Sequence, residues 1–459
     1  MDDLIADVHA QLRDAFDGRS VVIAGGMAVF AKRPIDQLRG LGAARFLVVG
    51  FGTGTGELPD GPDVEILTLD IEHPDDFIES IRAEEREIVR PSRSVLDAVA
   101  RFDPDRTAVV LAQPFLDVRD LGDRRVFGAR RSEWVAIEDK TTIDDVFDEL
   151  GVPRPAGTVV TADAASLARA VAQLDRGAGT VWSGDARDGF NGGGARVRWV
   201  RAEADRAEAL ELLLPRCDRV RVASFVQGVA CSMHGFVVDD GVAAFRPVEL
   251  VSLRASSPPW LRYCGCATYF DPPAEHVATM RASVQRVGEH LRANVGFRGA
   301  FTLDGISSAD GWVATECNPR YGAALNYLDT ALPELSMVLL HHAAVEGVVD
   351  VPHVALERAV VDAGARTRWG GAWTSSTRPI AETSTIALVG GAEGFRRAVD
   401  GEAGDATLSL GPGRTGGHVR IDLDPERTPR GRSIAPLAAA GFAFADREFD
   451  LGLGDLAAS

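Results

Sequence analysis

A β-hairpin is predicted for the stretch Gly296–Gly322, which reads GFRGAFTLDGISSADGWVATECNPRYG. Residues 300–306 alternate apolar and polar side chains, as a half-buried strand does. The polar turn Ser307–Gly311 ends in Asp-Gly, a dipeptide typical of tight hairpin turns. Because strand side chains repeat every second residue, Glu316 and Asn318 share one face of the returning strand.

The polar residues of this hairpin are expected to converge. Folding the hairpin about its turn places Asp304 opposite Ala314 and diagonal to Glu316, within about 7–8 Å of it. Two carboxylates and the Asn318 amide then meet, and Arg320 follows directly. Oxygen ligands of this kind suit Mg²⁺, which takes one or two carboxylates together with substrate phosphates. The alternative is a sheet with one solvated face, and the hairpin pattern alone leaves it open.

The whole stretch resembles the metal-binding hairpin of the ATP-grasp superfamily, to which biotin carboxylase and D-alanine–D-alanine ligase belong. The family pattern is a small-residue strand that ends in an acid, a turn, and Glu-x-Asn with Arg close behind. Here Arg298-Gly-Ala leads into Asp304, and Glu316-Cys-Asn318 is followed by Arg320. The resemblance implies that Asp304, Glu316 and Asn318 hold Mg²⁺ against the phosphates of ATP. It also implies catalytic roles for Arg320, which would stabilise an acyl phosphate, and for Arg298.

A second motif lies at residues 138–160, EDKTTIDDVFDELGVPRPAGTVV. Thr142 and Asp145 fit a helix N-terminus, and Gly151 followed by prolines ends that helix. The motif resembles the start of the ATP-grasp region, which implies that Lys140 binds phosphate. Of 49 basic residues only Lys32 and Lys140 are lysines, so a lysine kept here is consistent with a need for a compact charge. The alternative is a solvated charge beside a helix.

A glycine-rich segment follows the predicted strand at residues 180–184. In the family such a loop covers the phosphates with backbone amides, and the resemblance assigns this role to residues 188–194, in particular Gly192, Gly193 and Gly194. The family's second phosphate lysine is missing, because Trp182 or Ser183 stands in its place. Whether Arg187, Arg196 or Arg198 replaces it stays open, and so does the option of an inactive relative.

The adenine site is expected at a strand and hinge over residues 219–228. The resemblance implies that backbone groups of Ser224, Phe225 and Val226 read the base edge, although the acidic residue usual in this hinge is absent. Glu249, on a later predicted strand, is a further candidate for a nucleotide contact.

Composition excludes several classes of protein. The net charge of −18 argues against a general nucleic-acid or anionic-membrane surface. Met1–Phe16 is an acidic amphipathic helix and not a signal peptide, and the apolar runs are too short to span a bilayer. The five cysteines have no zinc-site spacing and indicate reduced thiols. We expect a cytoplasmic protein that binds neither nucleic acid nor membrane.

Four domains are predicted within an α/β fold class. Residues 1–136 alternate short strands and helices, as in a Rossmann-like pre-ATP-grasp domain. Residues 137–222 and 223–348 form the small and large lobes of the ATP-grasp core, and residues 349–459 form an extra α+β domain. Residues 50–56, GFGTGTG, are interpreted as a plain loop, because turn formers and not a helix follow them. A helix is predicted at residues 392–399.

The layout looks most like the actinobacterial pheganomycin-type peptide ligases. This resemblance implies an ADP-forming ligase of natural-product (antibiotic) biosynthesis, which uses ATP and Mg²⁺ to join a carboxylic acid to the amine of an amino acid or peptide. Alternatives are a ligase that uses a free amino acid and an ATP-binding protein without turnover. The C-terminal arginines Arg420, Arg427, Arg430 and Arg432 are candidates for recognition of a carboxylate or peptide. A homodimer is one option, but the sequence fixes neither the oligomeric state nor the substrates.

Overall fold

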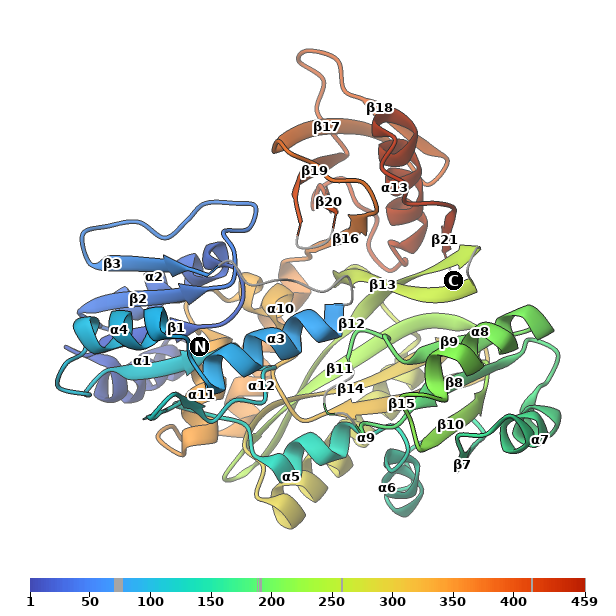
Figure 1. Cartoon of the computed structure of the whole chain (residues 1–459), viewed down its shortest axis with the longest axis horizontal. Coiled ribbons are helices and arrows are strands. Elements are labelled where there is room, and N and C mark those ends of the chain that lie inside the picture. The colour runs from blue at the N-terminus through green and yellow to red at the C-terminus, as the bar shows by residue number, and fades with distance from the viewer. Residues whose placement is uncertain (70–76, 188, 190–191, 257–258, 414–415, 459) are drawn as a thin grey trace.

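The computed structural model describes residues 1–69, 77–187, 189, 192–256, 259–413 and 416–458. Figure 1 shows an N-terminal α/β layer at one side of a large sheet, a small lobe at the other side, and a C-terminal domain above them. Among the described residues, no helix combines the length and the apolar character needed to cross a membrane.

The N-terminal layer is a parallel sheet with strand order β3-β2-β1-β4. Its central strands are buried on both faces, as parallel strands covered by helices are. Val21 and Val48 pack into the core on the side of α1 and α2, whereas Val22 and Val49 pack against α3 and α4. The elements are α1 (Asp2–Phe16), β1 (Ser20–Ala24), α2 (Lys32–Gly40), β2 (Arg45–Gly50), β3 (Val64–Thr68), α3 (Phe77–Val89), α4 (Arg93–Phe102) and β4 (Val109–Ala112).

The small lobe is a four-stranded antiparallel sheet with order β7-β10-β8-β9. Two helices cover one of its faces, and their leucines bury Trp182 and Val222. A short helical segment, α5 (Ser132–Val135), η2 (Ala136–Glu138) and α6 (Ile143–Glu149), leads into it. The lobe itself comprises β7 (Gly157–Thr161), α7 (Ala164–Leu174), β8 (Thr180–Gly184), β9 (Val197–Val200), α8 (Glu203–Leu213) and β10 (Arg219–Ser224).

The large sheet has eleven strands among the described residues, in the order β15-β14-β11-β12-β13-β16-β20-β19-β17-β18, with β21 paired to β12. The pairing of β13 with β16 joins the strands of the C-terminal domain to those of the central part of the chain, so one sheet runs through both. The strands are β11 (Gly228–Val238), β12 (Gly241–Ser256), β13 (Pro259–Ala267), β14 (Gly299–Ser308), β15 (Gly311–Asn318), β16 (Gly370–Ser376), β17 (Ser384–Gly391), β18 (Gly394–Arg397), β19 (Ala406–Pro412), β20 (Gly417–Leu423) and β21 (Leu456–Ala458).

Helices cover the two faces of this sheet unequally. The long helix α9 (Ala274–Val295) packs on one face, where it buries Phe301 and Leu303, and each such side chain contributes about 1.5–3 kcal/mol. Phe236 and Ala300 point to the other face and meet α10 (Leu325–Ala331), α11 (Met337–Glu346) and α12 (His353–Arg366). In the C-terminal domain α13 (Ala435–Phe449) covers the sheet.

One predicted element is wrong. Residues 392–399, predicted as a helix, instead form the tip of the hairpin between β17 and β18. Gly390 and Gly394 have φ angles of 140° and 141°, which favour glycine and extend the chain away from a helix. Phe395 is the one residue of β18 that is buried, and Arg397 lies over the Phe449 ring of α13, so the strand is held by these contacts and by pairing with β17.

Candidate active site

The hairpin of β14 and β15 is present, and its register differs from the prediction. Asp304 pairs directly with Glu316, and Gly305 pairs with Ala314, because a bulge lies between Asp304 and Gly305. The expectation that Asp304 stands opposite Ala314 is therefore wrong. A Cβ atom at Gly305 would lie 2.4 Å from the carbonyl oxygen of Val313, so only glycine fits this bulge. The shift brings the two carboxylates directly opposite each other.

Asp304, Glu316 and Asn318 lie together, as the sequence predicts. The Asn318 amide donates a hydrogen bond of 3.0 Å to Asp304, and the Ser232 hydroxyl on β11 donates another to the same carboxylate. Asp304 and Asn318 are buried. Arg320 donates to the Asn318 amide oxygen at 3.2 Å. Arg320, which is predicted to stabilise an acyl phosphate, therefore adjoins the three predicted Mg²⁺ ligands.

Lys140 reaches this hairpin from the segment between η2 and α6. Its ammonium forms an ion pair with Glu316, and 14% of the Lys140 side chain is exposed. Asp139 holds the segment, because its carboxylate accepts hydrogen bonds from the Thr141 amide at 2.8 Å and hydroxyl at 2.7 Å. The structure therefore favours the functional interpretation of Lys140 over that of a solvated helix-flanking charge.

The two paired carboxylates differ in protonation. Burial and the adjacent Glu316 carboxylate raise the pKa of Asp304 above its ordinary value. Burial opposes ionisation of Glu316, but the Lys140 ammonium, the hydrogen bond with Asp304 and the charge of Arg320 together outweigh it and lower the pKa of Glu316. We therefore expect Asp304 to hold a proton while Glu316 is ionised. A cation between them would displace that proton, since metal ligands bind in the deprotonated form.

The donor set fits Mg²⁺. Two carboxylates and an amide oxygen are hard ligands, and Mg²⁺ completes its octahedron with phosphate oxygens and water. In the part of the chain that the structure describes, no three His, Cys, Asp or Glu side chains gather into a metal cluster. The donor set of the hairpin therefore suits a Mg²⁺ ion that binds together with a phosphate. It suits a structural metal held by protein ligands alone less well.

Glu138 is a site residue that the sequence reasoning missed. Its carboxylate forms ion pairs with Arg320, at 3.1 Å, and with Arg130, and all three side chains are at least 85% buried. Burial lowers the pKa of Arg130. The only sequence signal was the position of Glu138, two residues before Lys140. Glu138 fixes the guanidinium of Arg320 beside the hairpin.

A cavity of about 410 Å³ brings these segments together. Lys140, Glu138 and Asn318 line it, together with Gly192 from the glycine-rich loop. Gly193 and Gly194 follow with φ angles of 64° and 75°, which favour glycine. Residues 188, 190 and 191 of the predicted loop lie outside the described residues. The remaining lining residues are Asp117, Ser132, Val135, Ala136, Asp139, Thr142, Ala186 and Gly189.

The position of the missing second lysine has no basic side chain. Trp182 is fully buried in the small lobe, and Ser183 is buried beside it. The three arginines considered as replacements are each bonded inside the small lobe: Arg187 to Asp218 at 3.0 Å, Arg196 to the Arg216 carbonyl at 3.2 Å, and Arg198 to Glu208 at 3.5 Å. None of these three lines the cavity.

Two backbone amides of the predicted adenine hinge are hydrogen-bonded within the protein. The amides of Ser224 and Phe225 donate to the carbonyls of Ala156 and Gly179, at 2.8 and 3.2 Å, so in this structure they do not face a base edge. The Phe225 ring instead stacks on Trp199, with centroids 4.4 Å apart. Nucleotide contacts from the backbone carbonyls of Ser224 and Phe225 and from the half-buried Val226 stay predictions.

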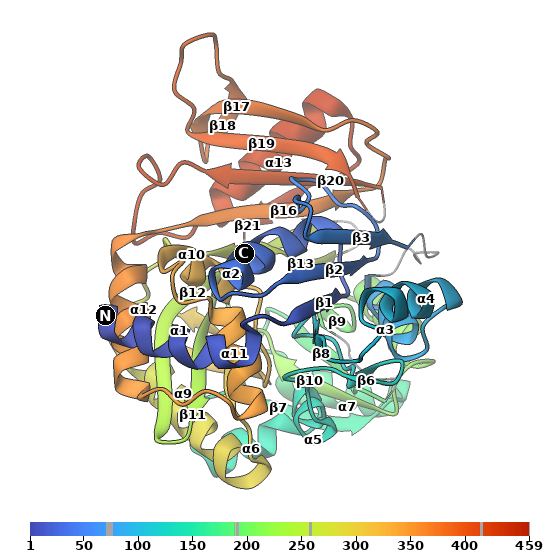
Figure 2. The ribbon, with the colours of Figure 1, turned by 90° about the vertical axis from the view of Figure 1, so that its left-hand side faces the viewer.

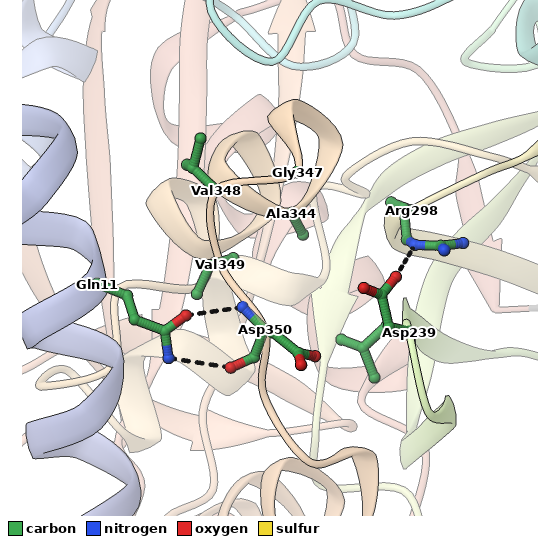
Figure 3. A pocket seen from close by; sticks show the side chains of 9 residues that line it. Gln11, Asp239, Arg298, Ala344, Gly347, Val348, Val349 and Asp350 are labelled. Atoms are coloured by element: carbon green, nitrogen blue, oxygen red, sulfur yellow. Dashed lines mark hydrogen bonds and ion pairs between the residues drawn. The ribbon is translucent and has the colours of Figure 1, made fainter.

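Two further predicted site residues lie elsewhere. Arg298 stands six residues before Asp304 on an extended chain, about 20 Å away. It pairs with Asp239 at 2.6 Å in a separate cavity of about 190 Å³ that Gln11 also lines (Figure 3). Its predicted catalytic role is wrong. Glu249 instead caps α13, because its carboxylate accepts hydrogen bonds from the Ser433 hydroxyl and the Ile434 amide; burial raises the Glu249 pKa.

No protein-family model matches the chain, and no curated protein matches its sequence. Solved structures do resemble it. An N5-carboxyaminoimidazole synthase from Aspergillus clavatus, in complex with ADP and 5-aminoimidazole ribonucleotide, is 14% identical over 94% of this chain and 99% of that chain, with a TM-score of 0.50. A biotin carboxylase–β,γ-ATP complex from Campylobacter jejuni is 10% identical over 89% of this chain and 88% of that chain, with a TM-score of 0.51. The chain therefore has the mixed α/β fold of the ATP-grasp enzymes.

Proposed function

We propose that the protein is an ADP-forming ligase that uses ATP to join a carboxylic acid to an amine through an acyl phosphate. The observation that carries this proposal is the convergence of Asp304, Glu316 and Asn318 with Lys140 and Arg320. Lys140 and Asn318 of this group line the cavity. The two similar structures add support, since the synthase is in complex with ADP and the biotin carboxylase is a complex with β,γ-ATP.

The chemistry follows from the charges. Mg²⁺ held by Asp304, Glu316 and Asn318 would neutralise the charge on the phosphate oxygens. Lys140 supplies a compact positive charge beside Glu316. Arg320, held by Glu138, is placed to donate hydrogen bonds to the oxyanion of an acyl phosphate and of the tetrahedral species that the amine forms. The amine displaces phosphate, so no side chain has to act as a nucleophile.

The finer function is peptide-bond formation in natural-product biosynthesis, by a cytoplasmic enzyme that binds neither nucleic acid nor membrane. The acceptor amine belongs to an amino acid or peptide, and a homodimer is the proposed assembly. Support comes from the C-terminal strands, which extend the same sheet that carries the metal-binding hairpin. A non-catalytic ATP-binding protein is the second candidate, and the absence of a basic residue at the second lysine position favours it.

Phosphate release from Mg-ATP tests the proposal, screened over carboxylic acids with and without amino acid and peptide amines. Release should require both partners and disappear in Asp304→Ala and Glu316→Ala. Asp310→Ala, an exposed acid in the turn of the same hairpin, is the matched control and should retain activity. ATP binding without release under every pair would instead support the binding protein.

A further inference from the structure

One charged side chain on the wall of the active-site cavity has no bonded partner among the described residues. Glu138 is bound by two arginines, and Asp139 accepts hydrogen bonds from the segment that it holds. The Lys140 ammonium pairs with Glu316. Asp117 also lines the cavity and is exposed. Within the part of the chain that the structure describes, its carboxylate makes no hydrogen bond or ion pair, and only its backbone amide is bonded.

The loop that carries Asp117 is held from two sides. The Asp117 amide donates to the Glu85 carboxylate on α3 at 2.9 Å. The carbonyl two residues earlier accepts a hydrogen bond from Arg130 at 3.0 Å. Arg130 in turn pairs with Glu138, the carboxylate that positions Arg320. A continuous set of contacts therefore connects this loop to the arginine beside the metal-binding hairpin.

The topology of the N-terminal sheet gives an independent reason to expect a ligand at this loop. Strands β3, β2 and β1 lie side by side (Figure 2), and β4 pairs with the other edge of β1. The loops that follow β1 and β4 meet there, because a Cβ atom on Gly25 would lie 2.8 Å from the Leu116 side chain. Open α/β sheets bind ligands at the carboxyl ends of their strands, where the strand order reverses. Asp117 follows β4 at this point.

The free carboxylate suits a ligand with positive charge. The Asp117 charge acts on the buried Arg130, but the terminal nitrogens of that guanidinium are bonded to a backbone carbonyl and to Glu138. Arg119, two residues along the chain, donates to the Ser132 hydroxyl on the cavity wall at 2.6 Å. A ligand ammonium, which has three donors, can therefore pair with Asp117, whereas a ligand carboxylate would be repelled.

The group that pairs with Asp117 is not the amine that reacts. An amine attacks a carbonyl carbon in its neutral form, and a paired carboxylate favours the protonated form instead. The attack takes place at the acyl phosphate beside Arg320, whereas Asp117 is held by α3 and the N-terminal sheet. The cavity therefore suits an acceptor with one amine that attacks and a second that stays charged.

We propose that the acceptor carries a second ammonium group, which pairs with Asp117 while the first amine attacks the acyl phosphate. The acceptor is thus a diamine or a basic amino acid. In the reaction the C–N bond forms, the bond between the carbonyl carbon and the phosphate oxygen breaks, and the proton lost by the amine ends on phosphate. The second ammonium and Asp117 are unchanged. This inference rests on the proposed ligase function and adds the charge of the acceptor and the residue that selects it.

Matched acceptors in the phosphate-release assay test the inference. Butylamine and 1,4-diaminobutane differ only in the second amine, and so do norleucine and lysine, which separates a diamine from a basic amino acid. In at least one pair, kcat/KM should be higher by about fivefold or more for the acceptor with the second ammonium, as for one partly exposed ion pair. Asp117→Asn, which keeps the size of the side chain, should remove this preference. Asp117→Lys should reverse it, so that 4-aminobutyrate is preferred to 1,4-diaminobutane.

Asp120→Asn is the matched control, because it removes an exposed acid from the same segment that does not line the cavity. It should leave the preference as it is in the wild type. Titration calorimetry with 1,4-diaminobutane, in the presence of ADP and Mg²⁺, measures the same contact without turnover. The wild type and Asp120→Asn should bind the diamine about fivefold or more tightly than Asp117→Asn does.

The outcomes separate this inference from the ligase. Equal kcat/KM within both pairs, or a preference that survives in Asp117→Asn, overturns the role of Asp117 and leaves the ligase standing. Diamine binding that needs Asp117, without phosphate release under any acid, overturns the ligase and the acceptor role and leaves only a cation site. Neither phosphate release nor diamine binding overturns both.

Discussion

The Glu138→Gln substitution should lower both the free energy of unfolding and kcat. Glu138 is the carboxylate between two arginines, and the side chains of Glu138, Arg130 and Arg320 are 10%, 3% and 15% exposed. A charge pair about 4 Å apart is worth about 4 kcal/mol at an effective dielectric constant of 20. Removing one partner of a buried pair costs about 3–5 kcal/mol, because the remaining charge stays desolvated. Since glutamine keeps one acceptor oxygen, we expect a loss of about 3 kcal/mol.

The same substitution leaves the Arg320 guanidinium without its anionic anchor beside Asn318. Loss of one preorganised donor typically costs about 10²–10³ in kcat. Urea unfolding measures the first effect and phosphate release the second. Asp97→Asn removes an exposed carboxylate from its own arginine, Arg93, and should change neither quantity. A Glu138→Gln protein with wild-type unfolding and wild-type kcat would refute the assignment of Glu138 as the residue that positions Arg320.

Three other predictions follow from single contacts. Lys140→Ala should lower kcat by about 10²–10³, and Lys140→Arg should restore part of it, because the ion pair to Glu316 can re-form; equal loss in both would contradict a charge role. Trp134→Ala should cost about 3–5 kcal/mol in urea unfolding, because Trp134 is 1% exposed and its indole donates to a backbone carbonyl. Burial lowers the pKa of His341 well below its usual value and that of His342 to about 4. The unfolded chain therefore binds more protons than the folded protein below about pH 6.5, so the free energy of unfolding should fall as the pH falls. The expected loss is up to about 1.4 kcal/mol per pH unit for each histidine. In His342→Asn the free energy of unfolding should fall less steeply with pH.

Local patterns in the sequence predicted the hairpin and its three ligands. Alternation along β15 puts Glu316 and Asn318 on one face, but Asp304 joins them through the bulge, because the register of Gly305 with Ala314 would otherwise pair Asp304 with Thr315. The bulge was not predictable, because it follows from the close approach of Gly305 to the facing backbone. Lys140 was found through the family resemblance and the scarcity of lysine, since no local pattern ties it to Glu316.

The errors have a common cause in tertiary context. Arg298 precedes the hairpin in sequence, but a strand carries it about 20 Å away from the ligands that it seemed to accompany. Glu249 has a charge suited to many roles, and its partner, the N-terminus of α13, lies far along the chain.

Oxygen transfer from the acid substrate tests the central claim most directly. With the acid identified by the phosphate-release screen, its carboxylate is labelled with ¹⁸O, and the products of one ligation are examined by mass spectrometry. Formation of an acyl phosphate predicts one labelled oxygen in the released inorganic phosphate, together with ADP and the amide. Label found in AMP, or phosphate released without label, would contradict the acyl-phosphate ligase.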